Sequence, residues 1–168
     1  MFSPISTTDI INRSHNCDIL QIINDFCLTY EQNLSDRDLL LSTRIDTDIP
    51  QLLIGDPLLI TQLLHDLSEY SLQQDARGCV VLDLKAEQEN EESYFIYITV
   101  TMSGKGIPMA KEKYLFSDKK TAGKADVATL YYARKISRFY DGDILVKNSI
   151  GFGTRFMVKI RLFCMDEY

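Results

Sequence analysis

Near the middle of the chain, an apolar run passes directly into two glycines and a proline: Val100-Thr101-Met102-Ser103-Gly104-Lys105-Gly106-Ile107-Pro108. The residues up to Met102 are mostly β-branched or apolar, which favours a strand. The glycines can adopt the positive backbone angles that tight turns need, and proline cannot continue the hydrogen-bond ladder of a strand. The stretch therefore predicts a strand that ends in a tight loop.

Further strands are predicted on both sides of this stretch. Cys79–Ala86 and Tyr94–Met102 are rich in β-branched and aromatic residues, and we expect them to form a hairpin. The acidic segment Glu87–Glu92 lies between them and is interpreted as the solvated tip of that hairpin. Ile144–Lys147 and Thr154–Phe163 are predicted to be the closing strands of the fold.

Apolar residues at helical spacing predict a first helix over Asp18–Asn33, with Asp18 or Asn16 as its cap. The short apolar segment Leu39–Ile45 is expected to follow it as a strand. A second helix is predicted to begin at Gly55-Asp56-Pro57, because an aspartate cap and a proline in the first turn are typical helix starts. The apolar face expected for this second helix comprises Leu58, Leu59, Leu63, Leu64 and Leu67.

A third helix is expected from about Ala125 to Tyr140, directly before the closing strands. The order of elements predicts an α+β fold: a two-layer sandwich in which a mixed β-sheet carries three main helices on one face. At 168 residues the chain is expected to form a single domain over residues 1–168.

Composition limits the classes of function. The net charge of −6 gives no general attraction to nucleic acid or anionic membrane. No apolar stretch reaches the roughly 18 residues of a membrane span, and the first residues do not resemble a signal peptide. The four cysteines are widely scattered, which predicts reduced, buried thiols rather than a metal site. We therefore expect a cytoplasmic protein without direct membrane insertion.

Four segments, in this order, resemble the catalytic ATP-binding domain of sensor histidine kinases, part of the GHKL superfamily of ATPases. Leu53-Ile54-Gly55-Asp56-Pro57 resembles the start of the family's asparagine helix, and Gly104-x-Gly106-Ile107-Pro108 resembles its adenine loop. Tyr114-Leu115-Phe116 resembles the segment before the nucleotide lid. Asn148-Ser149-Ile150-Gly151-Phe152-Gly153-Thr154-Arg155-Phe156 resembles the terminal hairpin and is the most specific of the four.

The resemblance covers about Phe2 to Leu162 and implies a nucleotide pocket, called the candidate pocket below. Its residues are Asp66, Tyr70, Gln73, Met102, Gly104, Gly106, Val127, Thr129, Gly153 and Thr154.

The asparagine helix departs from the family pattern Asn-Leu-x-x-Asn-Ala-x-Lys at its three polar positions. In the family, the second asparagine holds Mg²⁺ against the phosphates and the lysine faces phosphate. Here Asp66, Tyr70 and Gln73 stand at the three positions. A tyrosine phenol is a bulky, poor ligand for a hard cation, and Gln73 carries no charge. Asp66 is the one remaining oxygen ligand in this helix that the resemblance implies.

The adenine and phosphate loops depart from the family as well. Met102 stands where the family has an aspartate that accepts a hydrogen bond from the adenine amino group. Loss of such a bond costs roughly 1.5–3 kcal/mol, or about 10–100-fold in affinity. The family's phosphate-cradling Gly-x-Gly-Leu is matched by Val127-Ala128-Thr129-Leu130, which lacks both glycines. Gly104 and Gly106 are interpreted as turn glycines rather than pocket remnants.

These departures predict a degenerate histidine-kinase ATP-binding-type domain of two-component signal transduction. Such a pseudokinase would not bind ATP and would act by protein–protein contact, with no cofactor. One alternative is a divergent active ATP-binding domain that uses Mg·ATP through Asp66, backbone groups and Thr154. Another is a non-catalytic phosphotransfer or anti-sigma-like regulatory module.

The expected partner is a protein: a response regulator receiver domain or the remainder of a sensor kinase, whose acceptor and dimerisation helices this chain lacks. The basic segment Lys119–Arg138 is the expected docking face. His15 and His65 are interpreted as ordinary surface and helix histidines. No catalytic residue and no metal ligand is predicted.

Overall fold

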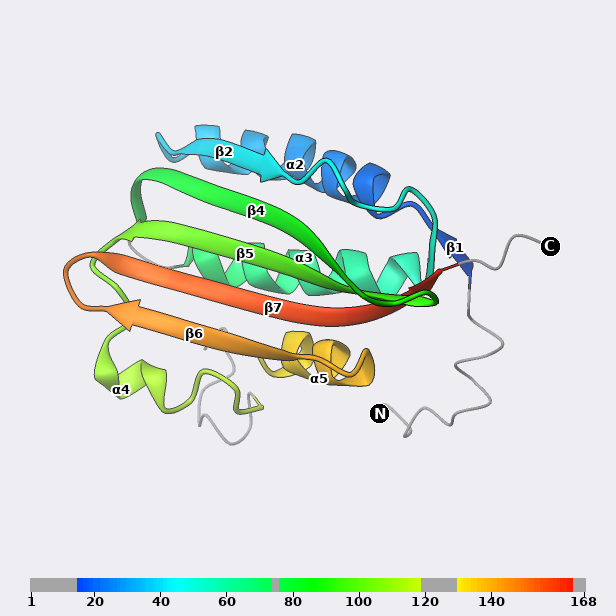
Figure 1. Cartoon of the computed structure of the whole chain (residues 1–168). Helices are drawn as coiled ribbons and strands as arrows, with labels where there is room; N and C mark the ends of the chain where they lie inside the picture. The colour runs from blue at the N-terminus through cyan, green and yellow to red at the C-terminus, as the bar shows by residue number, and fades with distance from the viewer. Residues whose placement is uncertain (1–14, 74–75, 119–129, 165–168) are drawn as a thin grey trace.

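A computed structural model describes residues 15–73, 76–118 and 130–164 (Figure 1). The elements, in chain order, are β1 (His15–Cys17), α2 (Ile19–Ser35), β2 (Leu40–Ile45), β3 (Leu53–Gly55), α3 (Pro57–Leu72), β4 (Ala76–Asn90), β5 (Ser93–Gly104), α4 (Met109–Glu112), α5 (Tyr131–Phe139), β6 (Asp143–Ser149) and β7 (Gly153–Cys164).

The strands of the described ranges form one mixed sheet in the order β1-β3-β7-β5-β4-β2, with β6 also paired to β7. Only β2 and β4 are parallel, because the helix α3 and strand β3 separate them in sequence. The long antiparallel pairs β4–β5 and β5–β7 form the centre of the sheet. The expected mixed sheet is confirmed.

The three longer helices lie on one face of the sheet, and α3 packs between α2 and α5 (Figure 1). The core fills the space between the two layers. It includes alternate residues of the central strand β5, namely Ile96, Ile98, Val100 and Met102. No helix of the described residues covers the opposite face of the sheet, which is called the open face below (Figure 1). The α+β two-layer sandwich is therefore confirmed.

Both predicted helix caps are confirmed. The Asp18 carboxylate accepts a hydrogen bond from the Gln21 N–H at 3.0 Å, and the Asp56 carboxylate accepts one from the Leu58 N–H at 2.9 Å. Pro57 occupies the first helical turn, where its missing N–H costs nothing. Leu58 is a correction: its side chain is 79% exposed, because in this first turn it points away from the sheet.

Strand β4 is longer than the sequence predicts, and three short elements were missed. The acidic segment is exposed as expected, but β4 runs on through Asn90 and the turn is only Glu91-Glu92. The short elements β1, β3 and α4 were not predicted, since three or four residues carry no periodicity. The third helix is described only from Tyr131, and its expected beginning lies outside the described residues.

All four cysteines are free thiols: Cys17 is buried and the other three are half-buried. Burial raises the pKa of the Cys17 thiol to about 11, with smaller contributions from the carboxylates of Asp18 and Asp56. None of the helices in the described ranges is long and apolar enough to span a lipid bilayer.

Candidate functional site

Tyr70 lies on the buried face of α3, with only 3% of its surface exposed. Its ring meets the ring of Phe156 on β7 edge to face, with centroids 5.5 Å apart. Burial raises the pKa of the Tyr70 phenol to about 12, and the carboxylate of Glu112 on α4 raises it further. The ring is therefore buried between α3 and β7, and the phenol stays neutral.

Met102 lies on the same inner face of the sheet and is also 3% exposed. In register, it stands between Val80 on β4 and Thr154 on β7. Met102, Tyr70 and Phe156 belong to one buried cluster. The position that the resemblance assigns to an adenine-binding acid is thus occupied by an apolar core side chain.

The loop after β5 is fastened to the turn between β6 and β7. The Gly104 N–H donates to the Phe152 carbonyl oxygen at 3.3 Å, and the Gly151 N–H donates to the Lys105 carbonyl oxygen at 2.8 Å. Gly106 has a φ of +79°, and a Cβ there would lie 2.8 Å from Asn148 Oδ1. The loop glycines therefore serve a tight turn and a close backbone approach.

Asn148 joins this loop to the terminal hairpin. Its Oδ1 accepts from the Ile107 N–H at 2.8 Å, and its Nδ2 donates to the Ile107 carbonyl oxygen at 2.8 Å. The Thr154 hydroxyl also donates to Asn148 Oδ1, at 3.1 Å, and Thr154 is 4% exposed. A side chain at Gly153 would overlap the Met102 carbonyl oxygen. Hairpin and loop form one hydrogen-bonded unit.

We expect Gly106→Ala to lower the free energy of unfolding by about 1–3 kcal/mol, because it adds backbone strain and a clash. The matched control is Gly151→Ala. Gly151 has a similar φ of +85° but nothing within 4 Å of an added Cβ. Urea denaturation of both variants separates the two causes. Equal losses would show that the contact with Asn148 contributes nothing.

The remaining residues of the candidate pocket are dispersed. Asp66 is half-buried on α3 and accepts a hydrogen bond from Gln62 Nε2 at 2.7 Å. Gln73 is exposed and caps the end of α3, where the Arg37 guanidinium also donates to the Leu72 carbonyl oxygen. Val127 and Thr129 lie outside the described residues. The structure thus brings Tyr70, Met102, Gly106, Gly153 and Thr154 to one region and leaves Gln73 at the surface.

No group of three or more His, Cys, Asp or Glu side chains in the described ranges is placed to hold a metal ion. His65 is exposed and meets the Phe26 ring at a centroid distance of 6.0 Å. His15 is exposed on β1. Both histidines are surface residues, as the sequence predicts.

Comparison with known proteins identifies the family. Residues 55–163 match the family described as histidine kinase-, DNA gyrase B-, and HSP90-like ATPase. The chain belongs to this family. The matched range begins at β3 and ends in β7, so it contains α3, the glycine loop and the terminal hairpin.

Curated relatives are sensor kinases of much greater length. The chain is 27% identical over 150 residues to sensor histidine kinase RcsC of Escherichia coli (strain K12), covering 85% of this chain and 15% of that protein. It is 22% identical over 169 residues to hybrid signal transduction histidine kinase F of Dictyostelium discoideum, covering 95% of this chain and 15% of that protein. The chain thus spans a small part of these relatives.

Two solved structures share the fold. One is full-length ShkA in complex with AMPPNP, with a TM-score of 0.74, 15% identity, and coverage of 90% of this chain and 32% of that one. The other is the catalytic domain of histidine kinase ThkA in a nucleotide-free form, with a TM-score of 0.67, 18% identity, and coverage of 88% and 94%. At these identities the likeness supports the fold alone.

Sequence reasoning missed three residues of the site. Asn148 appeared only as part of a motif, although its side chain satisfies both backbone groups of Ile107. Phe156 and Glu112 gave no signal of their own, because their roles depend on the position of Tyr70. The sequence signal that could have identified Asn148 is its position just before Gly151 and Gly153, because asparagine side chains often hydrogen-bond to backbone groups in turns.

Proposed function

We propose that this domain is a degenerate histidine-kinase-type ATPase domain that does not bind Mg·ATP and acts in two-component signalling by contact with other proteins in the cytoplasm. The observation that carries the proposal is the burial of Tyr70 against Phe156 at the position of the family's Mg²⁺-binding asparagine. A buried neutral phenol offers little to a hard cation that prefers compact oxygen donors.

The burial of Met102 also supports the proposal, because Met102 stands where the family has an adenine-binding aspartate. A methionine offers no useful acceptor to an adenine amino group, so the site would lose a charge-assisted hydrogen bond. Combined with the loss of a phosphate-facing lysine at Gln73, even partly additive effects move a micromolar site beyond millimolar. These residues do not fit Mg·ATP.

The divergent active domain requires Asp66 and Thr154 to serve the nucleotide. The Asp66 carboxylate already accepts from Gln62, and the Thr154 hydroxyl is buried and donates to Asn148. These contacts favour structural roles for both side chains. Nothing in the described residues favours the phosphotransfer or anti-sigma-like alternative over the degenerate kinase domain.

The docking face expected at Lys119–Arg138 is less basic than its sequence indicates over the part that the structure describes, from residue 130 onward. Asp143 binds two of its cations, with Arg134 Nε at 2.9 Å and Arg138 at 3.3 Å. Burial alone would raise the pKa of Asp143, but the hydrogen bonds from Arg134, the Ile144 N–H and Arg138 outweigh it and lower the pKa. One carboxylate offsets one of these two positive charges, so α5 offers less positive charge to a receiver domain or to the rest of a sensor kinase than its sequence indicates.

The test is thermal unfolding with nucleotide. A site with a Kd of about 10 µM would gain about 3.7 kcal/mol of stability at about 5 mM ligand, which displaces Tm by several degrees. We expect Tm to stay unchanged when ATP and Mg²⁺ are added. The control contains ATP and a chelator in place of Mg²⁺, and we expect the same Tm there. A saturable rise in Tm that depends on Mg²⁺ would contradict the proposal.

A further inference from the structure

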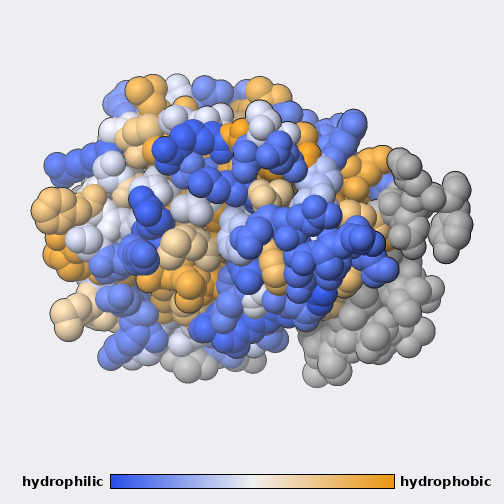
Figure 2. Space-filling model, in the orientation of Figure 1, coloured by the Kyte–Doolittle hydropathy of each residue, from blue (hydrophilic) through white to orange (hydrophobic). Residues whose placement is uncertain are grey.

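The open face of the sheet is not covered by any helix of the described ranges (Figure 1). Figure 2 views this face and shows hydrophobic atoms interspersed with hydrophilic ones, rather than a fully charged surface. Leu145 on β6 is 64% exposed here, and Met157 stands directly opposite it on β7. Two neighbouring apolar residues alone do not mark a contact surface, so the charges around them decide whether a partner would bind here.

Unbalanced positive charge lies next to these apolar residues. Lys147 on β6 is paired in register with Arg155 on β7, and both are exposed. Like charges directly opposite on neighbouring strands destabilise a sheet. Arg155 Nε donates to the Thr101 hydroxyl at 3.2 Å, and in the part of the chain that the structure describes neither cation has a carboxylate partner. A negative group from outside would relieve this repulsion.

A groove of about 930 Å³ begins at Arg155 and crosses β7, β5, β4 and β2. Thr99 and Met157 lie in its middle, and Lys85 on β4 lines its other side. Lys85 is exposed and also has no carboxylate partner among the described residues. The groove therefore has an unpaired cation on each side and short or apolar side chains between them.

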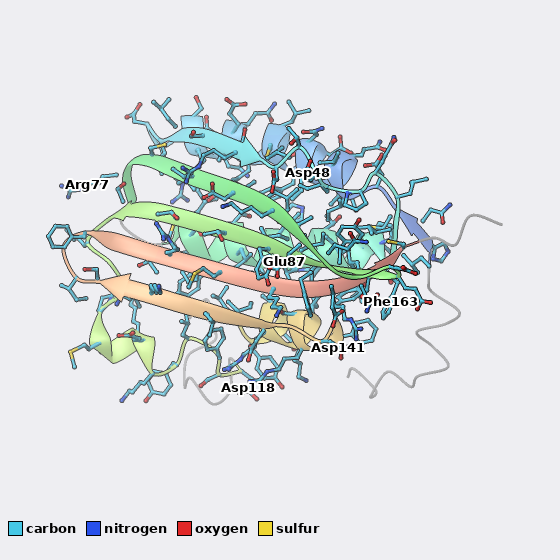
Figure 3. The ribbon with its side chains drawn as sticks, viewed as in Figure 1. Asp48, Arg77, Glu87, Asp118, Asp141 and Phe163 are labelled. Atoms are coloured by element: carbon cyan, nitrogen blue, oxygen red, sulfur yellow. The ribbon has the colours of Figure 1, made fainter. Side chains whose placement is uncertain are left out.

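Three carboxylates also lie near the groove, and one of them, Asp83, is in an ion pair. Asp83 forms an ion pair with Arg44, including a 3.0 Å contact from the second guanidinium nitrogen. Glu87, labelled in Figure 3, accepts from the Tyr97 hydroxyl at 3.3 Å and follows Lys85 by two residues on β4. Asp46 also lines the groove, where its side chain accepts from the Thr47 N–H. Asp46 and Glu87 accept only from neutral donors here and keep their charge, so the four cations Arg44, Lys85, Lys147 and Arg155 exceed the three carboxylates by one. The positive surplus therefore lies at the Lys147–Arg155 pair, in a chain whose net charge is −6.

We propose that this groove docks an amphipathic, acid-bearing helix of a protein partner. The helix would lie over Thr99 and Met157, with carboxylates facing Lys85 at one end and the Lys147–Arg155 pair at the other. From strand spacing and rise, the two ends are roughly 16 Å apart. A helix covers this span in about 11 residues, or three turns. The docking proposal rests on the proposed function in one respect: both assign the domain a protein partner.

A protein helix fits this face better than single-stranded nucleic acid. Nucleic acid would need open aromatic rings on which bases can stack. The Lys159 ammonium already lies 3.8 Å from the centre of the Phe95 ring and 5.8 Å from that of Tyr97. The two aromatic rings of β5 that the face offers are therefore engaged by the protein's own cation.

The experiment uses the full chain, isotopically labelled, and a synthetic helical peptide of about 18 residues with glutamates about 11 residues apart and leucines between them. We expect saturable amide shifts at Leu145, Lys147, Arg155 and Met157. Lys147→Glu with Arg155→Glu should weaken binding about tenfold or more at low salt. The matched control, Lys111→Glu with Lys113→Glu, makes the same change of net charge on exposed residues of α4 and its end, and should weaken it about twofold at most.

Two further ligands, a basic peptide and an oligonucleotide, test the chemistry of the partner. A peptide with lysines in place of the glutamates should bind the reversed variant better than the natural chain. The docking proposal is overturned if the shifts lie on α5, if both double variants weaken binding equally, or if the peptide fails to bind. Saturable binding of a poly-dT oligonucleotide to this face in place of the peptide would also overturn it. Nucleotide binding is measured separately by Tm, so failure of the docking leaves the proposed loss of ATP binding intact.

Discussion

Met102→Asp is expected to lower the free energy of unfolding by about 3–5 kcal/mol, because it leaves an unpaired charge in the core. Met102 is 3% exposed, and its register neighbours Val80 and Thr154 offer no cation. We also expect no ATP binding from this variant, since Tyr70 still fills the adjoining space. Urea denaturation followed by nucleotide titration measures both effects.

The control is Thr101→Asp, one residue earlier on the opposite face of β5. Thr101 accepts from Arg155, so a carboxylate there gains a cationic neighbour, and we expect a change within about 1 kcal/mol. Met102→Leu should also cost less than about 1.5 kcal/mol, because volume and polarity are kept. Tight ATP binding by Met102→Asp alone would show that the pocket was open.

Tyr70→Ala is expected to cost about 3–5 kcal/mol, which is typical of removing a large buried aromatic side chain. The ring packs on Phe156 of β7 and is only 3% exposed. Thermal or urea unfolding measures the loss. A loss below about 1 kcal/mol would mean that the ring does not fill the pocket in solution.

Tyr70→Phe is the matched control, because it keeps the ring and its contact with Phe156. It removes only the hydroxyl, so we expect a cost of about 1 kcal/mol. Tyr70→Asn together with Met102→Asp restores two family residues at once. This pair is the minimal change for which we expect any recovery of nucleotide binding.

The sequence was informative where one local rule decides the structure. Asp18 and Asp56 were predicted as helix caps because the side-chain hydrogen bond is formed within three residues. Strand β5 is predicted from its β-branched and aromatic residues, and the structure confirms it. The fold followed from the order of these elements and from the motif resemblance.

The candidate pocket could be predicted only in part. Tyr70 and Met102 were identified as departures, but their burial together depends on how α3 meets β7, which no local pattern encodes. The pairing of Arg138 with Asp143 was missed, because side chains five residues apart across a turn look like free surface charges in sequence. The groove on the open face also escaped notice, since Lys85, Lys147 and Arg155 come from three strands.

A calorimetric titration of the unaltered chain with a non-hydrolysable Mg·ATP analogue tests the central claim most directly. We expect no saturable heat up to about 5 mM ligand, because the loss of acid, asparagine and lysine together removes micromolar affinity. A saturable, Mg²⁺-dependent isotherm with a Kd in the micromolar range would contradict it, and would show that this domain still binds nucleotide.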